Sequence, residues 1–481
     1  MNKNEYKGYE AVMGLEIHVQ VVGCDCNSKA FSPTRATNDE ERPNWNIDTL
    51  DFGLPGSLPR FNEKVAELAT RTGLALNCEI QNLSLFDDKN YQYPDLPCGR
   101  QITQQYYPIA KGGQVPIPTE KSPDRYIALD HIHIEQDAGK SNHDALPDCS
   151  AIDYNRAGIG LLEIVTQPCI YDIADLNIFL KSLRAILIAI KVSNCNMDKG
   201  EMRADLSLSV RKIGVKTLGT RVEIKNLNSI NGVQKAAKHE FVRQVEAILA
   251  GEKILQETRG FDPKSQTTFA MRLKEDANEY LYIPDYNLPP LELTDEYIQH
   301  QKNSLPKLPK ERCAELVGKK LPWSNAYLIA YEQEYFEYFT QLTKGMTRTQ
   351  TNTAAKLMIG DLFGLLKDST RDLQSFNQKY LKELTLALDT GKISSKIAKE
   401  LLLLAFEKDI SPNSQIVPQV SDVNAIAKCV DQVLLNSPNE VARYKDGKTN
   451  LLGLFVGTVM KEMKNANPNI VSQIVQDKLK D

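Results

Sequence analysis

The chain has 481 residues, of which 42% are hydrophobic and 25% charged, values typical of a globular protein with two or three domains. Its formal net charge of −4 excludes a protein that is basic throughout, so contact with nucleic acid would need a local basic patch. The sequence has no apolar run of about 20 residues, no signal or transit peptide, and nine cysteines without a repeating pattern, which together predict a cytoplasmic protein with free thiols and no membrane span.

The first part of the chain, up to about residue 294, mixes strand and helix signals. Alternating polar and apolar residues predict strands within 14–20, 130–141, 201–210 and 220–229. Apolar residues at helical spacing predict helices over 62–76, 172–190 and 232–250. Asn62 suits an N-cap, Gly251 suits a helix end, and the apolar helix over 172–190 is expected to cover a sheet.

Prolines separate this part from a helical C-terminal part. The prolines between 289 and 309 argue against a continuous helix there. Helical spacing then dominates 309–408, and a second break over 409–422 leads into a short helical tail. We therefore predict three domains, at 1–294, 295–410 and 411–481.

The four predicted strands share an unusual set of polar residues. On their polar faces lie Glu16, His18 and Gln20; His131, His133, Glu135 and Asp137; Arg203, Asp205, Ser207 and Ser209; and Arg221, Glu223 and Lys225. A solvent-facing strand is the usual explanation for one such segment. Histidine is scarce, however, with six residues in all, and half of them fall in the first two segments. Carboxylates that converge with histidine are typical of a site for a divalent metal and a nucleoside triphosphate.

Two further segments carry weaker signals. A proline-rich loop, KNYQYPDLPCGRQITQ, contains Lys89 and Tyr91 and has the composition of a ligand-binding loop, although for this segment taken alone a proline-stiffened connection is the favoured explanation. Near the C-terminus, Arg443, Lys445, Lys448, Lys461 and Lys464 outnumber Asp446 and Glu462. From charge alone, an ordinary solvated surface is the favoured interpretation of this stretch. A GxxxxGK[ST] loop is absent, so an ATP site would have to be carried by the sheet.

These polar segments belong to a longer ordered set: GLEIHVQ, GLPGSLP, LALNCEI, KNYQYPDLP, HIEQDAGKS, DYNRAGIGLLEIV, NMDKGEMRADLSLSV, GTRVEIKNLNS and LLGLFVGTVMK. Together they resemble the B-subunit family of the tRNA-dependent amidotransferases, from about residue 9 to 479. A piece such as GLPG is a weak signal alone, but the ordered set is specific.

The resemblance implies an α+β fold: a glutamine-synthetase-like cradle with mainly antiparallel sheet, then an all-helical domain, then a small helical tail domain that binds tRNA. It implies that ATP and Mg²⁺ are used to phosphorylate the side-chain carboxylate of Glu-tRNA(Gln) or Asp-tRNA(Asn). Ammonia, released from glutamine by the amidase (A) chain of the complex and channelled to this site, would then displace the phosphate. A small third (C) chain would complete the heterotrimer.

The resemblance also implies roles for individual residues. The implied metal ligands are Glu16, His18, Glu135 and Glu163, and Asp205 and Asn226 would bind ATP or metal. The implied catalytic residues include Arg203, Glu223 and Lys225, of which Arg203 and Lys225 are the better candidates for phosphate contact. Two more catalytic candidates, Lys89 and Tyr91, would lie near the channel mouth or the reacting carboxylate. For each of them, the alternative is a structural ion pair.

The sequence departs from the family where many members carry four cysteines for zinc. Ser32 and Thr34 stand at the first pair of positions, and Asp48 and Asp51 stand at the second. Cys24 and Cys26 lie upstream of the first pair, so a set made of these two cysteines and the two aspartates is a weak alternative. We therefore predict that zinc is absent.

Two rival functions remain at this point. A non-catalytic tRNA-binding protein on a degenerate version of the fold would have no reason to keep Glu16, His18 and Glu135. A stand-alone ligase of glutamine-synthetase type would have no need for the basic helical tail.

Overall fold

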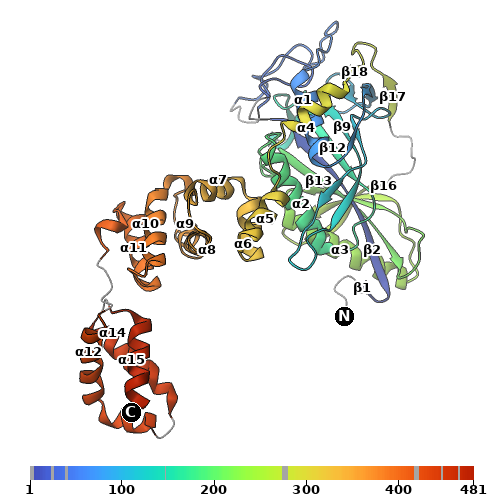
Figure 1. Ribbon diagram of the computed structural model, residues 1–481. Coiled ribbons are helices and arrows are strands. Elements are labelled where there is room, and N and C mark those ends of the chain that lie inside the picture. The colour runs from blue at the N-terminus through green and yellow to red at the C-terminus, as the bar shows by residue number, and fades with distance from the viewer. Residues whose placement is uncertain are drawn as a thin grey trace. The chain divides into compact units, whose positions relative to one another are not determined.

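A computed structural model describes residues 5–22, 26–37, 42–146, 148–273, 280–416, 422–445, 448–463 and 466–480 (Figure 1). The chain divides into two compact units, 1–312 and 313–481. The first unit contains the strands, and the named elements of the second are helices.

An 11-stranded sheet dominates the first unit. Its strands are β1 (Glu5–Tyr6), β2 (Tyr9–Gln20), β3 (Glu79–Ile80), β7 (Ala110–Lys111), β8 (Gln114–Pro116), β9 (Tyr126–Gln136), β12 (Gly160–Thr166), β13 (Met202–Lys212), β14 (Val222–Leu227), β15 (Glu257–Asp262) and β16 (Thr267–Leu273). They run in the order β16-β15-β14-β13-β2-β12-β9-β7-β3, with β1 beside β2 and β8 beside β9. Neighbours are antiparallel except β14 and β15, which are parallel.

Three smaller sheets complete the strands of this unit. They are formed by β17 (Leu281–Pro284), β5 (Asp87–Asn90) and β6 (Arg100–Thr103); by β10 (Lys140–Leu146) and β11 (Cys149–Asp153); and by β18 (Leu291–Glu292) and β4 (Leu83–Ser84). The first of these matters for function, because β5 carries Lys89.

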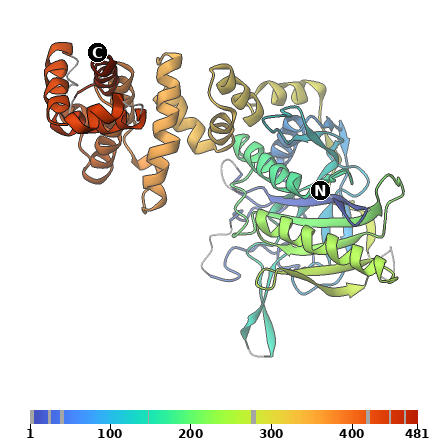
Figure 2. The same cartoon turned by 90° about the horizontal axis from the view of Figure 1, so that it is seen from below.

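The large sheet has one apolar face and one polar face. On β2, Leu15, Ile17 and Val19 are buried in a hydrophobic core together with the alternating apolar residues of β13. Helices α1 (Glu63–Ala75), α2 (Ile173–Ala189) and α3 (Ile230–Leu249) contribute to the same core. Figure 2 shows α2 and α3 lying along the sheet, and the two helices pack against each other. Because the core covers the apolar face, a functional site on this sheet would lie on the polar face.

The helices α1, α2 and α3 each begin at a side-chain cap. Asn62 accepts a hydrogen bond from the amide of Lys64, as predicted, and Asp172 caps α2 in the same way. Helix α3 begins two residues earlier than predicted because Ser229 accepts from the amide of Gly232, which places that glycine inside the first turn. A further helix, α4 (Asp295–Asn303), was not predicted: it fits between the proline pairs that exclude a longer helix.

The second unit is helical, as the spacing over 309–408 predicts. Its elements are α5 (Pro309–Gly318), which begins in the first unit, α6 (Trp323–Tyr331), α7 (Gln333–Leu342), α8 (Arg348–Lys356), the π-helical turn η1 (Leu357–Leu362), α9 (Phe363–Lys367), the 3₁₀ turn η2 (Leu373–Ser375), α10 (Gln378–Asp389), α11 (Ser395–Lys408), the 3₁₀ turn η3 (Pro412–Ser414), α12 (Val423–Leu435), α13 (Pro438–Lys445), the 3₁₀ turn η4 (Thr449–Leu451), α14 (Leu452–Glu462) and α15 (Pro468–Lys480).

The tail helices have a hydrophobic core of their own. Helices α12, α14 and α15 pack around Val430, Phe455, Val459, Val471 and Val475, all of which are buried. The predicted α+β class, with a mainly antiparallel sheet followed by helices, is confirmed. The predicted boundaries at 294 and 410 remain predictions.

Candidate active site

Neighbouring strands of the large sheet bring the predicted polar residues into one row. In the antiparallel register, Glu163 of β12 lies opposite His18 of β2 on one side and opposite His133 of β9 on the other. Opposed residues of antiparallel strands point to the same face of the sheet. Strand β13 extends the row, because Asp205 lies opposite Glu16. Residues far apart in the chain therefore meet on one surface.

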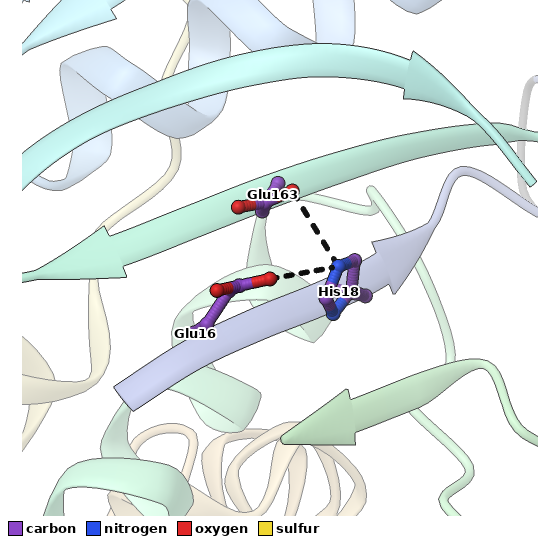
Figure 3. A group of neighbouring side chains, drawn as sticks. All are labelled: Glu16, His18 and Glu163. Carbon is purple, nitrogen blue, oxygen red and sulfur yellow. Dashed lines mark ion pairs between the residues drawn. The ribbon is translucent and has the colours of Figure 1, made fainter. Parts of the chain in front are cut away.

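Glu163 lies between the two histidines. Its Oε2 atom is 3.5 Å from Nε2 of His18 and 3.2 Å from Nε2 of His133. Nε2 of His18 is also 3.5 Å from Oε1 of Glu16 and 3.7 Å from Oε1 of Glu135. Figure 3 shows Glu16 and Glu163, from neighbouring strands, both pointing toward His18. Three carboxylates thus converge on this imidazole.

These side chains form two overlapping groups that could hold a metal ion. One group is Glu16, His18 and Glu163, and the other is His133, Glu135 and Glu163; within each, the potential ligand atoms lie within 4.8 Å of one another. Carboxylate oxygens suit Mg²⁺ and Mn²⁺, and imidazole adds affinity for transition metals. The donor set therefore fits a divalent cation, with Glu163 common to both groups. All four ligands implied by the resemblance belong to these groups, and His133 is an addition.

When no cation is bound, protons balance the negative charge of these carboxylates. Burial lowers the pKa of His18, but Glu163 and the other carboxylates raise it, and the resulting pKa is about 9. The same balance brings the pKa of His133 to about 10. Burial would raise the pKa of Glu163, yet the two histidines hold it well below the usual range. Burial, and then the charge of Glu163, raise the pKa of Glu16 to about 7. A bound divalent cation would displace these protons.

The lysine on β14 is held by two carboxylates beside this row. Nζ of Lys225 lies 2.8 Å from Oδ2 of Asp205 and 3.2 Å from Oε1 of Glu223. Burial lowers the pKa of Lys225, but the two carboxylates raise it above its usual value, so the side chain is an ammonium. The carboxylate of Glu223 also accepts a hydrogen bond from Thr258. Glu223 thus helps to hold Lys225 in place, and its catalytic role stays a prediction.

An arginine on β13 is fixed by a carboxylate that the sequence prediction did not include. Arg203 donates to Oδ1 of Asp137 at 2.9 Å, and Gln20 donates to Oδ2 of the same carboxylate at 2.6 Å. Arg156 lies 3.5 Å from that oxygen. Asp137 stood on the predicted polar face of its strand, so the alternation carried the signal, but only the fold shows that it orients two arginines.

A cavity of 380 Å³ opens over this surface. The described residues that line it are Glu16, His18, Lys89, Tyr91, Gln101, Glu135, Asp137, Ala138, Leu161, Arg203, Ala204, Asp205, Lys225, Asn226, Leu227, Asn228 and Tyr280. Every predicted site residue is in this set except Glu163, whose carboxylate lies between the two histidines, and Glu223. Lys89 and Tyr91 come from the segment predicted to be a loop, a prediction that is wrong at both ends, where β5 and β6 pair as strands. Gln101 of β6 and Tyr280 were not predicted.

A second cavity, of 470 Å³, shares Arg203 and Asn228 with the first. Its lining includes Lys140, Arg156 and Lys199. With Arg203, basic residues outnumber the two acidic residues of this lining, Asp153 and Asp198.

Several enzyme families could carry a site of this kind, and comparison with known proteins shows which one this chain belongs to. Residues 11–299 match the GatB/GatE catalytic domain, and residues 337–479 match the GatB domain. The chain is 39% identical over 480 residues to the B subunit of the aspartyl/glutamyl-tRNA(Asn/Gln) amidotransferase of Persephonella marina, an alignment that covers 98% of this chain and 100% of that protein. The chain belongs to the GatB family.

Other members of the GatB family are similarly close. Proteins with the same name from Ehrlichia chaffeensis and Clostridium botulinum are 40% and 37% identical over 479 residues. Each alignment covers 98% of this chain, with 98% and 99% of the two relatives. The resemblance stated from the sequence is confirmed, and it extends over the site and the tail together.

A buried ion pair lies among the positions where the family resemblance implies zinc ligands. Lys29 is fully buried, and its Nζ donates to Oδ2 of Asp51 at 2.8 Å. The hydroxyl of Ser32 donates to Oδ1 of Asp51 at 2.9 Å, and that of Thr34 donates to Oδ2 at 2.8 Å. Burial lowers the pKa of Lys29, and Asp51 opposes this shift. Three of the four substituted positions are thus tied together by hydrogen bonds.

The other residues considered for zinc contribute less to this cluster. Asp48 donates its backbone amide to Asp51 at 3.1 Å. The thiol of Cys26 is buried and donates to the carbonyl of Ser28 at 3.5 Å. Cys24 lies outside the described residues, as do Asp446 and Lys464 of the predicted basic stretch. Among the described helices, none combines the length and apolar character that crossing a membrane would require.

Proposed function

We propose that this chain is the B subunit of a tRNA-dependent amidotransferase, a glutamine-hydrolysing ligase, and that the 380 Å³ cavity activates the side-chain carboxylate of Glu-tRNA(Gln) or Asp-tRNA(Asn) with ATP. The observation that carries the proposal is the row of Glu16, His18, Glu163, His133 and Glu135 beside Arg203 and Lys225 in a GatB-family fold. Membership of the family supports the reaction, and the row supplies the chemistry that the reaction needs.

The proposed reaction has two steps. A carboxylate oxygen of the aminoacyl group attacks the γ-phosphorus of ATP, the bond to the β-phosphate oxygen breaks, and ADP leaves with an acyl phosphate in place. Ammonia then attacks the acyl carbon, phosphate leaves, and one proton is lost from nitrogen, so that the amide remains. A carboxylate is a poor electrophile, and the first step converts it into one with a good leaving group.

The residues of the cavity suit these steps through charge and position. Glu16, His18, Glu135, Glu163 and His133 would hold one or two Mg²⁺ ions, which when bound neutralise phosphate charge. The ammonium of Lys225 and the guanidinium of Arg203 are already oriented by carboxylates, so they can contact phosphate without losing further freedom. Asn226 and Asp205 lie beside them and complete the proposed nucleotide site.

Lys89 acts in this proposal as a charge and not as a base. Burial lowers its pKa, but Glu135 and neighbouring groups raise it above the usual value, so Lys89 is protonated throughout the working pH range. Burial raises the pKa of Tyr91 to about 12, so its hydroxyl stays neutral. Together they would bind the reacting carboxylate and the anion that forms when ammonia attacks.

The proposal includes partners and a location. Ammonia would come from an amidase (A) chain, and a small C chain would join the two, in the cytoplasm where aminoacyl-tRNA is made. The relatives are named as subunits, which supports an assembly of several chains.

The main test is ATP hydrolysis by this chain with its A and C partners on mischarged Glu-tRNA(Gln). We expect hydrolysis that requires the mischarged tRNA and that falls at least about 100-fold in Glu135→Ala, because one carboxylate of the row is lost. Hydrolysis that persists in the variant would move the metal site elsewhere. Wild-type protein without tRNA-stimulated hydrolysis would favour a non-catalytic tRNA-binding protein on the same fold.

The tail domain is proposed to bind tRNA through its basic residues. Arg443, Lys445, Lys448 and Lys461 are exposed. Changing all four to Gln should weaken tRNA binding and reduce the slope of log affinity against log salt by about 0.7–0.9 for each phosphate that is no longer neutralised, while ATP binding persists. The matched control changes four exposed lysines of the helical part, Lys379, Lys382, Lys392 and Lys396. Equal effects in the two variants would contradict the assignment of the tail.

We also propose that the chain holds no structural zinc. Asp51 already receives hydrogen bonds from Lys29, Ser32 and Thr34, and an ammonium within 2.8 Å of Oδ2 repels a cation. Elemental analysis of the purified protein should give well below one zinc per chain. Stoichiometric zinc that EDTA removes together with stability would refute this proposal.

A further inference from the structure

The ammonium of Lys89 lies among aromatic rings within the cavity. Lys89 belongs to β5 of the small three-stranded sheet, whereas the carboxylates of the row belong to the large sheet. Its Nζ is 4.8 Å from the ring centre of Tyr280 and 5.8 Å from that of Tyr91. The two rings meet edge to face at 5.2 Å, which is a stable arrangement for aromatic pairs. The ammonium thus has two aromatic rings beside it.

The charges of two carboxylates also act on the Lys89 ammonium. Glu135 and Glu163 both raise the pKa of Lys89 through their charge, and Tyr282 and Tyr91 also face it. Among the described residues, however, no carboxylate oxygen lies within 4.0 Å of Nζ, so Lys89 forms no ion pair with them. Lys89 therefore faces the metal-ligand carboxylates without neutralising either of them.

This separation matters because an ion pair would compete with a metal. A flexible lysine that faces carboxylates moves toward them unless another contact holds it back. If Nζ reached Glu135, an ammonium would occupy a carboxylate oxygen that a metal ion needs. A ring face is the type of contact that holds an ammonium without neutralising it.

We propose that Tyr280 is a positioning residue, whose ring holds the Lys89 ammonium away from Glu135 and Glu163 so that these carboxylates stay free to bind a divalent cation. The inference rests on the proposed function for its metal. Tyr280 is the nearer of the two rings and immediately precedes β17, in which Tyr282 lies opposite Lys89. The pairing of β17 with β5 thus brings the backbone next to Tyr280 beside the strand that carries Lys89.

The test measures Mn²⁺ binding to the full chain by titration calorimetry, without ATP or tRNA. Tyr280→Phe keeps the ring face and should bind Mn²⁺ within about twofold of the wild type. Tyr280→Leu keeps an apolar side chain at this partly exposed position but loses the ring face, and it should weaken Mn²⁺ binding about fivefold or more. Adding Lys89→Met to Tyr280→Leu should restore the affinity, because the competing ammonium is then gone.

The outcomes separate this inference from the proposed function. Wild-type affinity in Tyr280→Leu, or weak binding that Lys89→Met does not restore, would overturn the positioning role while the metal site stands. A wild type that binds no Mn²⁺ would contradict the metal site and, with it, this inference. A chain that binds Mn²⁺ in the expected order but shows no tRNA-stimulated ATP hydrolysis would retain the inference and reject the proposed function.

Discussion

Glu163→Gln should cost more activity than any other single change in the row, about 1,000-fold in tRNA-stimulated ATP hydrolysis. Glu163 is the residue that both metal-ligand groups share, so its loss weakens both. A metal's stabilisation of a transition state is worth several kcal/mol, and each 1.36 kcal/mol is a factor of about ten in rate. The glutamine has nearly the same shape, so the loss would come from charge.

A second measurement on Glu163→Gln does not depend on activity. The charge of Glu163 raises the pKa values of His18 and His133, which are about 9 and about 10. In the variant, both pKa values should fall, and NMR titration of the imidazole signals would detect this. The matched control is Glu10→Gln on the same strand β2, where the carboxylate pairs with Arg211 outside the cavity. Activity and histidine pKa values that match the wild type in Glu163→Gln would remove this residue from the site.

Lys29→Met should destabilise the first unit by about 3–5 kcal/mol, the usual cost of leaving one partner of a buried ion pair alone. Methionine fills nearly the same volume, so the loss would reflect the unpaired Asp51, which is 5% exposed. Urea unfolding followed by circular dichroism gives the overall change. Hydrogen exchange of the amides of Ala30 and Asn62, which bond to the carbonyls of Gly158 and Ala30, reports on the loop itself.

Two companion variants show whether charge is the cause. Adding Asp51→Asn to Lys29→Met should recover part of the lost stability, because the uncompensated charge is then removed. Lys64→Met breaks a more exposed pair with Glu67 and should cost less than about 1 kcal/mol. If Lys29→Met were no more costly than Lys64→Met, the buried pair would contribute little to the fold.

Period-two alternation in the sequence is enough to place Glu16, His18, Glu135 and Asp205 on polar strand faces. It could not show which strands are neighbours, since the pairing of β2 with β12 and β13 joins segments far apart in the chain. Glu163 stands alone within the apolar run LLEIV, and only the family resemblance selected it. Its position between two histidines required the register.

Two of the residues that sequence reasoning missed, Tyr280 and Lys29, lie outside regular alternation, whereas His133 and Asp137 stood on a predicted polar face without being selected. Tyr280 precedes a short strand of a separate sheet, and only the fold brings that sheet to the cavity. Lys29 is a single lysine in a loop. Because a lysine is rarely fully buried, its residue type predicts an exposed side chain, whereas the structure shows a buried one. The roles of individual site residues remain predictions that the experiments above address.

The place of β2 in the middle of the large sheet has a consequence for synthesis on the ribosome. About 180 residues separate the end of β2 at Gln20 from the start of its neighbour β13 at Met202. At roughly 5–20 residues per second, the growing chain needs on the order of 10–40 s to supply that neighbour. During this interval a strand whose apolar face carries Leu15, Ile17 and Val19 has no partner on one edge, which makes the nascent chain a natural client for chaperones that shield β-prone segments.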